Sequence, residues 1–163
     1  MLLFRKKKGA RDAMEWMERW NRAMDEIERN LTGQIDCEHL GRIACCSAYH
    51  FQRMFTYLAN VSLGEYVRRR RMSLAAVDLQ SGRDKVIDVA ARYGYESPTA
   101  FNRAFRAVHG VAPSQVRSGS VAVKCYPRLV FHLTVQGGEE MQYRIETKAA
   151  FRVVGISRPL DRE

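Results

Sequence analysis

The chain has 163 residues, 46% of them hydrophobic, and its 27 Lys and Arg against 18 Asp and Glu give a formal net charge of +9. No apolar run approaches the length of a membrane span, and the apolar part of MLLFRKKKGA is too short for a signal peptide, so we expect a cytoplasmic protein with reduced cysteines. Residues 37–117 hold twelve Lys and Arg against six Asp and Glu. Such a basic region indicates a nucleic-acid or other anionic partner, with an inert basic surface as the alternative.

Helices are predicted from the N-terminal region onward. Residues 11–31 place apolar side chains at helical spacing, and Gly33 ends this helix. The stripe consists of Ala13, Met17, Trp20, Met24, Ile27 and Leu31. Asp36 is a suitable N-cap for a short helix over 37–44, and Ser47 is a suitable N-cap for a helix over 48–58.

The next helix is expected to be long. Ser62 and Glu65 have the spacing of a capping box that opens a helix ending near residue 80. A short helix over 85–92 and a turn containing Gly94 follow. Ser97 and Pro98 open a helix over 98–108, and Pro113 begins a last short helix.

Two stretches of this region match at a fixed offset of fifty residues, namely SAYHFQRMF (47–55) and SPTAFNRAF (97–105). The matched pairs include Ser47 with Ser97, Phe51 with Phe101, Arg53 with Arg103 and Phe55 with Phe105. Asn60 and Gly110 follow the two helices at the position where a left-handed residue is favoured. The repeat predicts one supersecondary unit used twice, composed of a short helix, a tight turn and a second helix.

This arrangement is a helix-turn-helix, whose second helix can enter the major groove of DNA. Tyr49, Gln52 and Arg53 lie on the side of the first copy opposite its phenylalanines, and Arg and Gln side chains can bind base edges there. The equivalent side of the second copy holds Thr99, Ala100 and Arg103. An ordinary solvated helix face is the alternative for either copy taken alone.

The stretches SAYHFQRMFTYLANVSLGEYVRRRRMSLAAVDL and VIDVAARYGYESPTAFNRAFRAVHGVAPSQVR resemble the DNA-binding domain of the AraC/XylS family of bacterial transcription regulators, over residues 12–118. The resemblance implies a mainly α fold, a seven-helix bundle with two helix-turn-helix units joined by a central helix near 63–80. It also implies that the two recognition helices read successive major grooves of double-stranded promoter DNA, with RNA polymerase as a further candidate partner. Carried over by position, the base-reading residues are Tyr49, Gln52, Arg53, Thr99, Ala100 and Arg103. Cys45 stands in the first turn, where the family often has glycine.

The run RRRR, residues 68–71, is interpreted as mostly structural. Consecutive helical residues point around the whole circumference, so we expect only one or two of the four to contact phosphate. Arg71 falls on the apolar stripe of its helix, so we expect it to snorkel or to pair internally, and the family resemblance suggests an acid such as Asp88 as its partner.

The sequence provides no support for catalysis or metal binding. Cysteines and histidines gather between residues 37 and 50, but their spacing matches no usual zinc-ligand pattern. No nucleophile–base set, glycine-rich phosphate loop or pair of carboxylates is apparent. We therefore expect a protein that is not an enzyme and has no cofactor.

Residues 119–163 are predicted to form a short C-terminal β appendage with strands over 128–135, 141–148 and 151–156. YRIETKAAFRVVGI resembles the beginning of the GyrI-like effector-binding domain that follows some AraC-type domains. The segment is too short to enclose a small-molecule effector, so its apolar residues must pack on the helices or on another chain, or it is a remnant of a longer protein. Its deletion is expected to leave DNA binding nearly intact.

Two functions remain. The first is a sequence-specific DNA-binding transcription regulator. The alternative is a truncated accessory module with weak DNA binding that acts through protein–protein contacts of its C-terminal strands. The sequence leaves the oligomeric state open.

Overall fold

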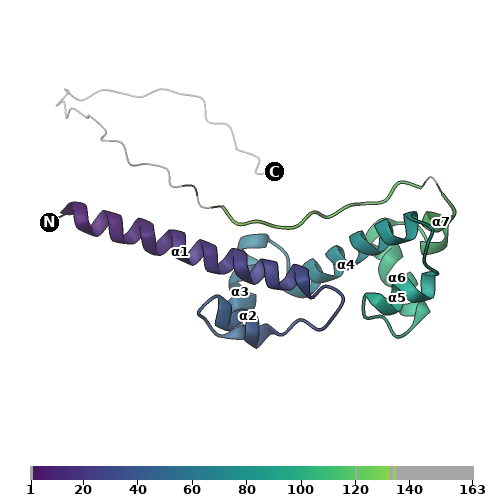
Figure 1. The fold of residues 1–163 in the computed structure, drawn as a ribbon, viewed down its shortest axis with the longest axis horizontal. Coiled ribbons are helices and arrows are strands. Elements are labelled where there is room, and N and C mark those ends of the chain that lie inside the picture. Colours follow the sequence, from purple (N-terminus) through teal and green to yellow (C-terminus); the bar gives the residue numbers. More distant parts are fainter. Residues whose placement is uncertain (1, 120, 133, 135–163) are drawn as a thin grey trace, which may run out of the picture. The chain divides into compact units, whose positions relative to one another are not determined.

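The structure, a computed structural model, describes residues 2–119, 121–132 and 134, with side chains described from residue 12 onward. Seven α-helices follow one another in this part of the chain, as the sequence predicted (Figure 1). They are α1 (Leu2–Arg29), α2 (Cys37–Ile43), α3 (Ala48–Ala59), α4 (Leu63–Gln80), α5 (Val86–Arg92), α6 (Pro98–His109) and α7 (Pro113–Ser118). The start of α1 lies before the predicted residue 11. No helix in the described part is long and apolar enough to cross a bilayer.

The predicted N-caps are confirmed. The Asp36 carboxylate accepts hydrogen bonds from two backbone N–H groups at the start of α2. The hydroxyl oxygens of Ser47, Ser62 and Ser97 each accept one from the backbone N–H three residues later. These bonds satisfy N–H groups that lack a partner inside the helix, which explains why each helix begins where it does.

The helix ends confirm the repeat as well. Asn60 after α3 has a φ of 52°, and Gly110 after α6 has a φ of 81°, so both adopt the left-handed conformation. One detail of the predicted capping box is wrong. The Glu65 carboxylate forms ion pairs with Arg68 and Arg69 and does not return to the N-cap of its own helix.

The first core gathers the buried faces of α1, α2 and α3 and the beginning of α4. Trp20 of α1 stacks on Phe51 of α3 with ring centroids 4.8 Å apart, and Phe55 packs on Tyr66 of α4. Other fully buried side chains of this core are Met24, Ile27, Leu31 and Leu40. Burial of this apolar surface is the main stabilising term for the first helix-turn-helix unit.

The second core repeats this arrangement with α5, α6, α7 and the later part of α4. Phe101 and Phe105 of α6 are fully buried, as are Met72 and Leu79 of α4 and Val89 of α5. Among the described helices, α4 packs on α5, α6 and α7 of the second unit and, less extensively, on α3 of the first. The central helix is therefore buried around most of its circumference rather than along one stripe.

The predicted strand over 128–135 is not found in its described residues. Residues 121–132, here called the C-terminal strap, have no regular secondary structure and belong to the same compact unit as the helices. Leu129 and Phe131 pack on the first core, and Val123 and Tyr126 pack on the second. Packing on the helices, one of the fates expected for the tail, thus applies to this segment. The other two predicted strands, 141–148 and 151–156, lie outside the described residues.

Candidate nucleic-acid interface

The solvent face of α3 carries the three side chains predicted to read bases. Tyr49 is 75% exposed, and Gln52 and Arg53 are also exposed, whereas Phe51 and Phe55 on the other side of the helix have no accessible surface. The two phenylalanines anchor the helix in the first core. The polar side chains are therefore held out to solvent on a helix whose orientation is fixed from behind.

The solvent face of α6 repeats the pattern. Thr99 and Arg103 are exposed opposite the buried Phe101 and Phe105, while Ala100 is half-buried and its N–H is bonded to the Ser97 cap. Sequence reasoning missed Asn102 and Arg106. Together with Thr99 and Arg103 they line a shallow depression on this helix. The offset of fifty pairs Asn102 with Gln52, so the sequence repeat could have identified Asn102 as a candidate base contact.

Arg53 and Arg103 have no internal partner in the described part of the chain. Its ion pairs and its side-chain hydrogen bonds include neither the Arg53 guanidinium nor the Arg103 guanidinium. A guanidinium offers five N–H donors in a planar fork that matches a guanine edge or a phosphate. These two side chains are free to bind an external acceptor.

The arginine run on α4 is used differently, because three of its four side chains are engaged within the fold. Arg69 pairs with Glu65 and lies over the Tyr126 ring, and Arg70 pairs with Glu28. Arg71 donates to the carbonyl oxygens of Leu31 and Gly33, so the suggested pairing with Asp88 is wrong.

Arg68 is the remaining member of this run. It pairs with Glu65 at the surface, and its side chain is 45% exposed. It lines an open cleft of about 740 Å³ together with Gln52 of α3 and Gly94, Tyr95 and Glu96 of the α5–α6 turn. Because Gln52 belongs to the solvent face of α3, this cleft opens beside the reading face of the first unit. Arg68 is thus the member of the run best placed to meet an anion.

The turn between α2 and α3 is unusually tight. Cys45 has a φ of 56°, in the left-handed region that favours glycine, and the equivalent turn before α6 uses Gly94 with a φ of 80°. A side chain on Gly41 would place its Cβ 2.7 Å from the Cys46 carbonyl oxygen and 3.0 Å from the Ala48 nitrogen. The missing side chain at Gly41 lets α2 approach the first turn of α3, a requirement that sequence reasoning did not identify.

Comparison with known proteins defines the class. The family model of the helix-turn-helix domain matches residues 40–119. The HTH-type transcriptional activator AarP of Providencia stuartii is 37% identical over 91 residues, which cover 56% of this chain and 67% of AarP. The multiple antibiotic resistance protein MarA of Escherichia coli K12 is 34% identical over 94 residues, which cover 58% of this chain and 74% of MarA.

A solved structure points the same way. The DNA-binding domain of the global transcriptional factor AdpA, in complex with a target DNA, superposes with a TM-score of 0.52 at 28% identity, covering 64% of this chain and 90% of that domain. With the duplicated helix-turn-helix and these relatives, the chain belongs to the AraC family of DNA-binding transcription regulators.

Proposed function

We propose that this chain is a sequence-specific regulator that places α3 and α6 in successive major grooves of double-stranded promoter DNA. The observation that carries the proposal is the duplicated arrangement of Arg53 and Arg103. Each is an exposed arginine without an internal partner in the described part of the chain, on a helix held from behind by two buried phenylalanines. A major groove admits one α-helix, and arginine bidentate to guanine is the commonest specific contact there.

The other residues of the two faces have chemistry suited to the same task. We assign base contacts to Tyr49, Gln52 and Arg53 on α3 and to Thr99, Ala100 and Arg103 on α6. Gln52 can bind adenine through its amide, and the methyl group of Ala100 suits contact with a thymine methyl. We add Asn102, because it is exposed and occupies the position equivalent to Gln52.

Selection of binding sites from a random DNA pool tests this proposal, because such a pool contains every short candidate site. The wild-type protein should enrich a bipartite motif whose halves lie about one helical turn apart, since two fixed helices can reach successive grooves only at that spacing. Arg53→Ala should relax sequence preference in one half alone, and Arg103→Ala should relax it in the other. Each should cost specific binding about 1–3 kcal/mol.

Arg83→Ala is the matched control, because Arg83 is exposed but lies in the loop after α4, outside both helix faces. It should leave the selected motif unchanged. Enrichment of a single undivided motif, or equal losses of Arg53→Ala and Arg103→Ala on specific and random DNA, would refute base reading by two helices.

Two finer proposals concern partners and the C-terminal residues. AarP is named as an activator, which supports RNA polymerase as a partner of the DNA-bound protein. The sequence YRIETKAAFRVVGI, which lies outside the described part, supports a GyrI-like identity for residues 119–163. Cross-linking of the promoter-bound protein to RNA polymerase would test the first. Because the segment is too short to enclose a small-molecule effector, we expect no saturable binding when effectors are titrated calorimetrically into the full chain.

A further inference from the structure

The C-terminal strap connects the two helix-turn-helix units a second time. It leaves α7 in the second unit and ends on α1 in the first, and Figure 1 shows it in green along the helices. At one end Val123 and Tyr126 pack on the second core, and at the other Leu129 and Phe131 pack on the first. Because α4 packs mainly on the second unit and only weakly on α3 of the first, the strap braces a joint that otherwise depends largely on this helix.

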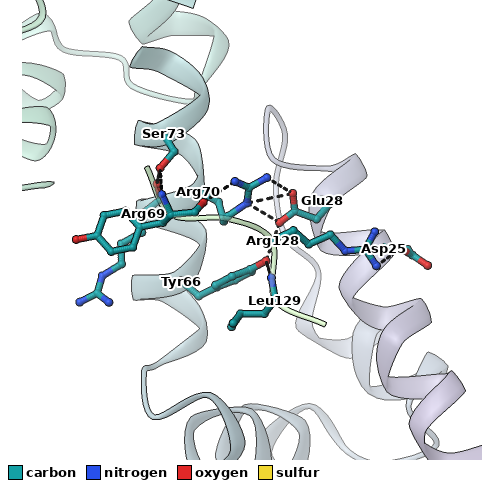
Figure 2. A network of polar contacts seen from close by, with 9 residues as sticks. Asp25, Glu28, Tyr66, Arg69, Arg70, Ser73, Arg128 and Leu129 are labelled. Carbon is teal, nitrogen blue, oxygen red and sulfur yellow. Dashed lines mark hydrogen bonds and ion pairs between the residues drawn. The ribbon is translucent and has the colours of Figure 1, made fainter. Parts of the chain in front are cut away.

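Side chains of α4 bind the backbone of the strap. Ser73 Oγ accepts from the Tyr126 N–H at 2.9 Å, Arg70 Nη1 donates to the Tyr126 carbonyl at 2.6 Å, and Tyr66 Oη accepts from the Leu129 N–H at 3.2 Å (Figure 2). Tyr66, Arg70 and Ser73 are spaced as i, i+4 and i+7, so they form one row along the helix. Backbone N–H and C=O groups of the strap are thus bonded to side chains of α4, whereas those of a β-strand are bonded to the backbone of a neighbouring strand.

The α1 end of the strap is held by an amide clamp. Asn21 Nδ2 donates to the Phe131 carbonyl at 2.9 Å, and Asn21 Oδ1 accepts from the Phe131 N–H at 2.9 Å. Arg128 adds an ion pair with Asp25, also on α1. These contacts fix the Phe131 backbone, and with it the direction in which its ring points.

The Phe131 ring reaches the back of the first recognition helix. It lies edge-on to Trp20, with centroids 5.8 Å apart, and edge-on to Phe55 of α3, with centroids 6.3 Å apart. Phe55 is on the buried side of α3, opposite Gln52 and Arg53, so the strap supports the reading face without occupying it. Tyr126 packs in the same way on the core that holds α6 from behind.

We propose that the strap is a positioning element for DNA recognition, which fixes α3 relative to α6 so that both recognition helices meet their grooves at once. The inference rests on the proposed function of the two helices. When two sites are rigidly held at the correct separation, the second binds at a high effective concentration, and a loose connection lowers this gain. Phe131 and Asn21 act through α3 and α1 and touch no DNA themselves.

The test compares full-length variants on DNA with both half-sites and on DNA with one half-site replaced by random sequence. Phe131→Ala removes the ring behind α3, and Asn21→Ala, a milder change, removes only the clamp. Val130→Ala is the matched control, because the neighbouring Val130 is 46% exposed. Affinity is measured at low salt, where one unit binds measurably, and at a temperature where circular dichroism shows each variant folded.

We expect both strap variants to lose about tenfold or more in affinity for the bipartite site, because the effective concentration of the second unit at its half-site falls. Their affinities for DNA with a single half-site should stay within about twofold of the wild-type values. Their discrimination against sites with two inserted base pairs should fall as well. Phe131→Leu should restore much of both properties, and Val130→Ala should match wild type.

Several outcomes would overturn this inference. Equal losses on bipartite and half-site DNA would show that the strap merely stabilises the fold, and wild-type behaviour of both strap variants would show that α4 alone sets the geometry. If the wild-type protein does not prefer bipartite DNA, the proposed function of the two helices is refuted. If the wild-type protein prefers bipartite DNA and the strap variants behave like it, only the positioning role of the strap is refuted.

Discussion

Gly41 shows how one absent side chain shapes the first helix-turn-helix. It is buried, and the backbone of Cys46, Ser47 and Ala48 passes over the place where its side chain would be. Backbone atoms cannot rotate away as a flexible side chain could. A Cβ here would therefore push α3 away from α2 and change the orientation of α3.

Gly41→Ala should lower the free energy of unfolding by about 1–3 kcal/mol, the usual cost of overpacking. Gly64→Ala, in the first turn of α4 with no atom within 4 Å of the added Cβ, is the matched control. It should raise the free energy of unfolding by about 0.5–1 kcal/mol, because alanine loses less backbone entropy than glycine in a helix. Urea unfolding measures both values. Equal effects of the two substitutions would contradict the tight approach of α2 to α3.

Residue-level prediction from the sequence succeeded where the repeat supplied a second copy. Arg53 and Arg103, with their buried phenylalanines, were placed on equivalent faces because the same spacing occurs twice. Asn102 was overlooked even though the offset pairs it with Gln52. Gly41 carries no such signal, because its role depends on a backbone approach across a turn. The Arg71 contacts with Leu31 and Gly33 likewise join residues about forty positions apart.

At the scale of elements, the ion pair of Glu28 and Arg70 joins α1 to α4 and the strap. The two side chains are only 15% and 11% exposed, and Arg70 Nη2 lies 2.6 Å from the Glu28 carboxylate. Burial alone would raise the pKa of Glu28, but hydrogen bonds from Arg70 and Tyr66 outweigh it and hold this pKa below its ordinary value. The same pair raises the pKa of Arg70. Both groups are therefore charged at neutral pH.

Glu28→Gln should lower the free energy of unfolding at pH 7 by about 3 kcal/mol, because it leaves the Arg70 charge nearly buried without a counterion. Since the folded-state pKa of Glu28 is depressed, its stabilising contribution is complete above the unfolded value of about 4.3 and is lost as the pH falls through the folded value. The variant should thus approach wild-type stability in acid. Urea unfolding at pH 7 and at about pH 3 measures the difference.

Glu18→Gln is the control for this prediction, because Glu18 is an exposed carboxylate on the same helix. It should change stability at neither pH by more than about 0.5 kcal/mol. A Glu28→Gln protein whose deficit is the same at both pH values would show that its effect arises from packing, not from the charge of the carboxylate.

The helices could be predicted from the sequence, whereas the strap could not. Helix ends depend on local chemistry, so Asp36, Ser47, Ser62 and Ser97 predicted the N-caps. The alternation of Leu129 and Phe131 correctly indicated burial but was interpreted as a strand. Strand assignment needs a backbone partner, and here the partners are Asn21 and the Tyr66–Ser73 row, which no local pattern reveals. The expectation that residues 119–163 are dispensable for DNA binding conflicts with the proposed positioning role of the strap, and the Phe131→Ala variant distinguishes the two.

For the whole molecule, the count of 27 Lys and Arg overstates the number of cations available to DNA. Arg69, Arg70 and Arg71 bind groups inside the fold, and Arg92 lies between Asp78 and Asp84. Within the described residues, Arg53, Arg103 and Arg106 remain without internal side-chain partners on the solvent faces of α3 and α6. These three arginines place positive charge without a counterion on the two helix faces proposed to bind DNA, which favours an approach with both faces toward the duplex.

Arg68 gives this distribution a measurable consequence. Its half-exposed guanidinium pairs with Glu65 and lines the cleft, and we expect it to contact a phosphate if α3 and α6 bind DNA as proposed. Arg68→Ala should weaken binding to specific and random DNA by similar factors and reduce the slope of log K against log salt by about 0.9, the value for one phosphate contact.

Arg29→Ala is the control, because Arg29 also forms an ion pair across three helical residues but lies on α1. It removes the same charge and should leave the slope unchanged. If both variants change the slope equally, the net charge matters and not its position. If Arg68→Ala acts on specific DNA alone, Arg68 reads a base, and the cleft belongs to the sequence-reading surface.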